Sequence, residues 1–231
     1  GRQNRELSQA LMGVRMIPFN SMADRLYRVV RLTAKELGKK ANLDIRGGQV
    51  ELDRSVLEKM IGPIEHLLRN AITHGLEDVA QRQAAGKPEI GEIALTLSQE
   101  GNEVVIDMTD DGAGLNYERI RSKAIEQGLL ASDQYPDEAV LTDFIFHAGF
   151  STARELTEIA GRGVGMDVVK SETAQLGGRI AVSSAPGKGA RFRIYLPLTL
   201  TVAQAPLVRV GVRTYAIPSV MVAQVMELKD E

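Results

Sequence analysis

Hydrophobic residues recur with a helical period in several stretches of the chain. The clearest lies within MIGPIEHLLRNAITHGLED, whose apolar residues fall at i, i+3, i+4, i+7 and i+8, as on one buried helical face. These residues are Ile64, Leu67, Leu68, Ala71 and Ile72. Weaker helical patterns occupy 1–16, 21–40, 117–128, part of 137–146 and 164–176. The pattern in 1–16 indicates the end of a longer helix.

Alternation of apolar and polar residues predicts two antiparallel hairpins, which imply a sheet covered on one face. One joins strands at 93–97 and 104–108 across QEGNE, and the other joins 180–182 and 192–196 across APGKGA. NLDIRGGQVELD adds a short strand and turn, and 198–231 predicts two or three strands of a separate β module. From 147 to 163 the pattern gives way to a glycine-punctuated segment typical of an active-site loop or lid.

Composition excludes several classes of function. The 231 residues are 44% hydrophobic and 25% charged, which is typical of a globular protein with one ordinary domain and pieces of its neighbours. A net charge of −2 argues against nucleic acid as a partner. The absence of Cys excludes a disulfide framework, a thiol nucleophile and a zinc site of the Cys type. The chain contains no run of about 18 apolar residues of the kind that spans a bilayer. We therefore expect a cytoplasmic protein that would serve any membrane receptor from the cytosol.

GRGVGMDVVK, from Gly161 to Lys170, places three glycines before a helical pattern, as a phosphate-binding loop does. It does not match the dinucleotide fingerprint, because Met166 or Val168 stands where the third glycine of Gly-x-Gly-x-x-Gly belongs. The chain also lacks a Walker A loop. Unpaired N–H groups and the positive dipole end of a helix N-terminus still suit phosphate. The alternative is a loop whose glycines serve only tight turns.

The helix around Ile64 to Ile72 also carries a polar stripe. His66, Asn70 and His74 are spaced by four and therefore lie beside the apolar face. Asn70 could offer its side-chain carbonyl to Mg²⁺, which prefers oxygen ligands and keeps other positions for phosphate oxygens and water. The alternative for each residue is an ordinary surface or boundary role.

VVIDMTDDGAG holds a second candidate site. Alternation places Asp110 on the inward face with Val104, Ile106 and Met108, while Asp111 points the other way. A buried carboxylate needs a donor, and the amino group of adenine would supply one. Gly112 and Gly114 would let the backbone turn tightly beside a ring, although a plain Asp-Gly turn remains the alternative.

In this chain order, the Asn-bearing helix, Asp-x-Gly-x-Gly and Gly-x-Gly-x-Gly resemble the N, G1 and G2 boxes of the Bergerat-fold ATP-binding superfamily. That superfamily contains histidine kinases, gyrase, MutL and heat-shock chaperone ATPases, and PGKGARF resembles its G3-like element. HLLRNAITHGLED, DDGAGL, AGFSTA and GRGVGMDVVK are similar to the CheA family of chemotaxis sensor kinases, including hybrid kinases of type IV pilus systems. The resemblance implies an α/β two-layer sandwich with a mixed, mainly antiparallel sheet, helices on one face, and nucleotide between lid and helix.

The resemblance also implies three domains. Residues 1–18 would end a helical dimerisation domain and its linker, and 19–197 would form the ATP-binding catalytic domain. GVRMIPF resembles the first junction. LPLTLTVAQAPLVRVGVRTYAIP resembles the start of an SH3-like, CheW-like regulatory domain, here an incomplete 198–231.

Site residues follow by position in the motifs. Asn70 would hold Mg²⁺, with His66 one helical turn before it, and Asp110 would take the adenine amino group beside Gly112 and Gly114. The residues expected toward the phosphates are Arg69, His74, Lys123, Ser151, Thr152, Gly161, Gly163 and Gly165. Two departures leave the turnover rate open: Arg119 stands where relatives often have Lys, and Ala190 replaces a usual Thr.

The implied activity is transfer of the γ-phosphate of ATP to a protein His. Hydrolytic relatives place a Glu four residues before the motif Asn, where this chain has His66, and Glu65 lies about 140° around the helix from Asn70. The alternatives are a non-catalytic ATP-binding scaffold and, with less support, an ATPase.

Partners follow from the same resemblance. None of the three His lies in the setting of a phosphotransfer domain, so the acceptor is expected on another domain or protein. The other expected partners are a CheW-like coupling protein, chemoreceptors, a response regulator and a second copy of the full-length protein. The expected location is cytoplasmic, at the receptors.

Overall fold

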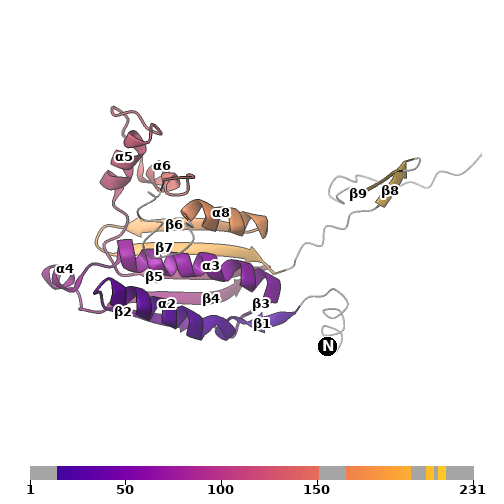
Figure 1. Cartoon of the computed structure of the whole chain (residues 1–231), viewed down its shortest axis with the longest axis horizontal. Coiled ribbons are helices and arrows are strands. Elements are labelled where there is room, and N and C mark those ends of the chain that lie inside the picture. The colour runs from indigo at the N-terminus through magenta and orange to yellow at the C-terminus, as the bar shows by residue number, and fades with distance from the viewer. Residues whose placement is uncertain (1–14, 151–164, 199–206, 211–212, 217–231) are drawn as a thin grey trace, which may run out of the picture. The chain divides into compact units, whose positions relative to one another are not determined.

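The computed structural model describes residues 15–150, 165–198, 207–210 and 213–216 (Figure 1). Two compact units divide the chain, Gly1–Pro197 and Leu198–Glu231. The first contains a five-stranded sheet in the order β2-β4-β5-β7-β6. Its strands are β2 (Ala41–Arg46), β4 (Gly91–Glu100), β5 (Glu103–Asp110), β7 (Gly189–Pro197) and β6 (Arg179–Ala185).

The sheet is mixed and mainly antiparallel, as expected. Both predicted hairpins form, β4–β5 and β6–β7, and β5 also pairs antiparallel with β7. Strand β2 pairs with β4 in parallel. The register sets Ile93 of β4 opposite Asp110 of β5, so Asp110 ends its strand beside the start of β4.

Three helices cover one face of this sheet (Figure 1). They are α2 (Ala23–Glu36), α3 (Arg54–Asn70) and α8 (Met166–Gln175). The predicted apolar face of α3 is buried, since none of its five residues is more than 5% exposed. On β5, the inward residues Ile106 and Met108 are buried as well, each 1% exposed.

Charged residues occupy the opposite face of the sheet. Arg191 of β7 donates from Nε to both carboxylate oxygens of Asp107 on β5, at 2.9 and 3.0 Å. Arg193 lies 3.3 Å from Glu100 and 3.5 Å from Asp107. This cross-strand ladder agrees with the expectation of a sheet covered by helices on one side.

The N-terminal part differs from the expected pattern. Met16, the last residue of the helical pattern 1–16, instead begins the strand β1 (Met16–Pro18), which pairs antiparallel with β3 (Glu51–Asp53). The first fourteen residues of that pattern lie outside the described residues. NLDIRGGQVELD therefore holds two strands in two sheets, because the turn at Gly47 and Gly48 redirects the chain. A 3₁₀ turn, η1 (Phe19–Met22), precedes α2 and buries Phe19 completely.

Helix α3 begins earlier than the apolar pattern indicated and ends in a wider turn. Asp53 caps its start by accepting from the Ser55 amide at 2.7 Å. At its C-terminus the chain continues as a π turn, η2 (Ala71–Gly75). A short helix that was not predicted, α4 (Val79–Ala84), follows and starts with a capping box between Asp78 and Gln81.

A small apolar cluster forms separately from the main core and includes residue 150. It joins α5 (Tyr117–Glu126) and α6 (Glu138–Phe144), which match the helices predicted for these stretches. Ile120, Ala124, Leu141, Phe144 and Phe150 form it.

In the part of the second unit that the structure describes, β8 (Leu207–Val210) pairs antiparallel with β9 (Arg213–Ala216). These two strands fall within the segment predicted to hold strands of a β module. Among the residues that the structure describes, no helix is both long and apolar enough to cross a membrane.

Candidate nucleotide site

Asn70 ends α3 with its amide held in one orientation. Its Nδ2 lies 3.1 Å from Nε2 of His66, one turn earlier, and 3.4 Å from Sδ of Met166 at the start of α8. The thioether of Met166 can only accept, which places the amide nitrogen toward it, and His66 Nε2 also accepts from this nitrogen in the tautomer that carries its proton on Nδ1. In this arrangement Oδ1 is the atom that can coordinate a cation. The structure thus brings His66 and Asn70 together as the spacing predicted.

His66 is a neutral imidazole at physiological pH. Its burial lowers the pKa from 6.5 to about 4, helped by the positive charges of Arg69 and His74 and opposed by Asp167. In the tautomer with its proton on Nδ1, Nε2 accepts from the Asn70 amide nitrogen. His66 therefore acts on Asn70 as a hydrogen-bond acceptor and holds its amide in place.

Asp110 is the last residue of β5, lies on its inward face and is 7% exposed. Its Oδ1 accepts from the Gly112 amide at 2.9 Å, and the Ala190 amide also donates to the carboxylate. Burial nevertheless raises the pKa of this carboxyl, so a further donor would stabilise its charged form. The amino group of adenine is such a donor.

Glycines form the wall around this carboxylate. A Cβ on Gly75 would lie 3.3 Å from the carboxyl atoms of Asp110, and one on Gly112 would lie 2.1 Å from the Gly75 carbonyl oxygen. Gly189, with φ +91°, approaches the Asp110 carbonyl so closely that a Cβ would stand 1.8 Å from it. Gly114 has φ +83°, a region that favours glycine. Only glycine at these positions therefore lets the backbone segments approach one another and the Asp110 carboxylate this closely.

Helix α8 starts beside Asn70. Gly165 is its N-cap residue, and Met166 makes the contact with the Asn70 amide. The first turn of a helix offers N–H groups without helical partners, which suits phosphate. Asp167, also in this turn, adds a carboxylate near His66.

Arg69 and His74, both expected toward the phosphates, lie in different surroundings near the end of α3. The guanidinium of Arg69 is 3.7 Å from Glu65 and borders the groove between α2 and α3, so the structure directs it toward α2. His74 is exposed, lies in the π turn and acts electrostatically on His66. It therefore stays near the Asn70 end of the helix.

The remaining expected residues are distributed between α5 and the lid. Arg119 is exposed on α5, and Nζ of Lys123 lies 5.2 Å above the Phe150 ring. Ser151, Thr152, Gly161 and Gly163 fall outside the described residues. Ala190, where relatives usually have Thr, contributes its backbone amide to Asp110, a contact that needs no hydroxyl.

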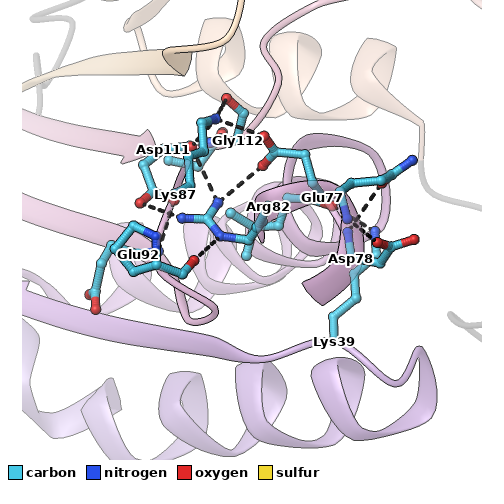
Figure 2. A network of polar contacts seen from close by, with 12 residues as sticks. Lys39, Glu77, Asp78, Arg82, Lys87, Glu92, Asp111 and Gly112 are labelled. Carbon is cyan, nitrogen blue, oxygen red and sulfur yellow. Dashed lines mark hydrogen bonds and ion pairs between the residues drawn. The ribbon is translucent and has the colours of Figure 1, made fainter. Parts of the chain in front are cut away.

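Sequence reasoning missed a polar network behind the Asp110 loop (Figure 2). Arg82 of α4 is completely buried and binds Glu77, Asp111 and the Pro88 carbonyl oxygen. Lys87 joins Glu77 to the carbonyl oxygens of Asp111 and Gly112. The only sequence signal here was the capping pattern Asp78-x-x-Gln81, which marks a helix start but not a buried arginine.

These residues fit a nucleotide with its cation. Asp110 offers a buried acceptor among closely packed glycines, and Asn70 presents an amide oxygen of the kind that Mg²⁺ binds. Within the described ranges no group of three His, Cys, Asp or Glu side chains is placed to hold a metal ion. Phosphate oxygens and water would complete the coordination of a cation at Asn70.

Comparison with known proteins places the chain in a family. The family described as histidine kinase-, DNA gyrase B-, and HSP90-like ATPase matches residues 61–200. CheA chemotaxis proteins are similar over nearly all of the chain. That of Klebsiella aerogenes is 43% identical over 94% of this chain and 33% of its own length. That of Treponema pallidum is 42% identical over 100% of this chain and 28% of its own length.

The chain spans about a third of the length of these curated relatives. A solved histidine kinase domain from Erythrobacter litoralis aligns with a TM-score of 0.47 and 15% identity, over 79% of this chain and 66% of that one. Family membership rests on the sequence matches. The chain belongs to the histidine kinase-, DNA gyrase B- and HSP90-like ATPase family, and its motif resemblance to CheA-type histidine kinases is confirmed.

Proposed function

We propose that residues 19–197 are the ATP-binding catalytic domain of a chemotaxis-type protein histidine kinase, which transfers the γ-phosphate of ATP to a His on a separate phosphotransfer domain. The observation that carries the proposal is Asn70, whose amide nitrogen faces the Met166 sulfur and lies 3.1 Å from Nε2 of His66, an orientation in which Oδ1 can bind a cation. The buried Asp110 carboxylate supports it by offering an acceptor for adenine.

The side chains would divide the work of binding and alignment. Asp110 accepts from the adenine amino group, and the glycines around it admit the flat ring. Asn70 Oδ1 holds Mg²⁺, which when bound neutralises phosphate charge and aligns the γ-phosphate. His66 fixes the Asn70 amide, while the N-terminus of α8 after Gly165 faces the phosphates with N–H groups.

Transfer to a protein acceptor is favoured over hydrolysis by the surroundings of Glu65. This carboxylate is 7% exposed and pairs with Arg25 of α2 and Arg69. It therefore lies on the α2 side of α3, where it cannot activate water beside Asn70. The position one turn before Asn70 belongs to His66, which is engaged with the Asn70 amide.

The wider assignment follows from the CheA-type relatives. In this proposal, residues 1–18 end a dimerisation domain of a homodimeric kinase, and 198–231 begin a regulatory β domain. That domain would bind a CheW-like coupling protein and chemoreceptors, and a response regulator would receive the phosphoryl group. The protein would work in the cytoplasm at the receptors.

One assay separates this proposal from its alternatives. The chain is incubated with γ-labelled ATP, Mg²⁺ and a histidine phosphotransfer domain, alongside the same domain with its acceptor His replaced by Ala. Label on the intact acceptor alone is the expected result. Free phosphate without labelled protein would indicate an ATPase, and ATP binding with neither product would indicate a scaffold.

A further inference from the structure

We propose that Arg82 is a positioning residue that fixes the Asp110 loop against the chain leaving the Asn70-bearing helix, and that it thereby sets the preference of the site for adenine. The inference rests on the proposed adenine contact of Asp110. It concerns a residue that does not itself touch nucleotide.

The Arg82 guanidinium ties together three segments (Figure 2). Nη1 donates to Glu77 at 3.0 Å, Nη2 donates to Asp111 at 2.9 Å, and Nε donates to the Pro88 carbonyl oxygen. Glu77 follows the π turn at the end of α3, and Asp111 is the neighbour of Asp110. The planar fork of Arg can satisfy these directions together, whereas a single ammonium cannot.

Charge and burial make the arrangement specific. Arg82 is 0% exposed and Glu77 is 12% exposed, so each needs the other as a partner. Lys87, 18% exposed, adds bonds of 2.7 Å to Glu77, 2.8 Å to the Asp111 carbonyl and 2.9 Å to the Gly112 carbonyl. These two cations and the carboxylates of Glu77 and Asp111 thus fix the loop that follows Asp110.

Backbone bonds carry this constraint to the site. The Ala113 amide donates to the Gly75 carbonyl oxygen at 2.9 Å, next to the position where Gly112 and Gly75 meet. The Asp111 carboxylate also accepts from the Glu92 amide at 2.9 Å, which fixes the loop to β4. A loosened loop would let the Asp110 carboxylate turn away from the position fixed by the Gly112 amide, and its acceptor would no longer discriminate between bases.

The test is the affinity of the full chain for ADP and for IDP, measured by calorimetry without phosphate transfer. Hypoxanthine carries a keto oxygen where adenine carries the amino group, so the ratio of the two dissociation constants reports the placement of Asp110. Arg82→Lys keeps the buried charge but loses the fork, and Lys87→Met removes the partly exposed contact. We expect the ratio to fall about tenfold in Arg82→Lys, the equivalent of one charge-assisted hydrogen bond, and to fall less in Lys87→Met.

Leu97→Ala is the control, because it truncates a buried side chain of β4 away from the network and destabilises the fold without moving Asp110. Its ratio should match that of the unmodified chain. If both variants fold and keep the ratio of the unmodified chain, the role of Arg82 is overturned, while the adenine contact of Asp110 is not. An unmodified chain that shows no preference for ADP would overturn the adenine contact, and this inference with it.

Discussion

At the scale of single residues, His66 makes the site sensitive to acid. Its folded pKa is about 4 against 6.5 for the ordinary group, so the unfolded chain binds more protons between these values. The stabilising contribution is present above pH 6.5 and is lost as the pH falls toward 4.

We therefore expect the chain to lose stability between pH 7 and pH 5 faster than His66→Gln does, by up to about 1.4 kcal/mol for each pH unit below 6.5. Gln keeps an acceptor for the Asn70 amide but does not titrate. Urea unfolding at both pH values measures the difference, with His147→Gln as the control. Equal pH dependence in the chain and in His66→Gln would contradict the assignment of a neutral His66.

Gly112 offers a second residue-scale prediction. A Cβ there would stand 2.1 Å from the Gly75 carbonyl oxygen and 2.9 Å from Oδ1 of Asp110. Gly112→Ala should weaken ADP binding about tenfold or more, because the clash displaces the carboxylate. Gly62→Ala is the control: with nothing within 4 Å, it should leave ADP binding unchanged and stabilise α3 by up to about 1 kcal/mol. Unchanged ADP affinity in Gly112→Ala would contradict the close packing described around Asp110.

At the scale of elements, the end of α3 depends on a side chain from another segment. Lys39 donates from Nζ to the carbonyl oxygens of Ile72, Thr73 and Leu76, at 2.8, 3.1 and 2.8 Å. These are carbonyls of the last turns, which have no helical partners. Lys39 thus closes the π turn that carries His74.

Lys39→Met should cost about 1–3 kcal/mol of unfolding free energy, since it removes charge-assisted bonds and keeps most of the aliphatic stem. Amide hydrogen exchange of residues 71–76 should also become faster. Lys40→Met is a matched control, because its exposed pair with Glu89 should contribute no more than about 1 kcal/mol. Similar exchange in both variants would show that Lys39 does not hold the turn.

Elements with strong local patterns could be predicted from the sequence, and those set by distant partners could not. The buried face of α3 and the two hairpins follow from periodicity alone. The parallel pairing of β2 with β4 joins segments about fifty residues apart, and no local pattern specifies such a partner. Met16 was wrongly placed at the end of a helical pattern, because its strand conformation comes from pairing with the distant Asp53 of β3.

At the scale of the whole molecule, the chain order of three motifs supports the proposed site more strongly than any motif by itself. Asp110 and Asn70 were singled out because each is a polar group beside an apolar face. Arg82 could not, because QRQAAGKPEI reads as an exposed polar segment, and only the fold brings Glu77 and Asp111 around it. Arg69 was expected toward phosphate, but the turn of the helix places it beside Glu65.

The measurement that tests the central claim most directly is transfer of label from γ-labelled ATP to a phosphotransfer domain by a pair of matched variants. Asn70→Asp replaces the proposed Mg²⁺ ligand, and Asn102→Asp makes the same chemical change in the exposed turn between β4 and β5. The account predicts that Asn70→Asp abolishes transfer while Asn102→Asp transfers at the rate of the unmodified chain. Transfer by folded Asn70→Asp at the unmodified rate would contradict it.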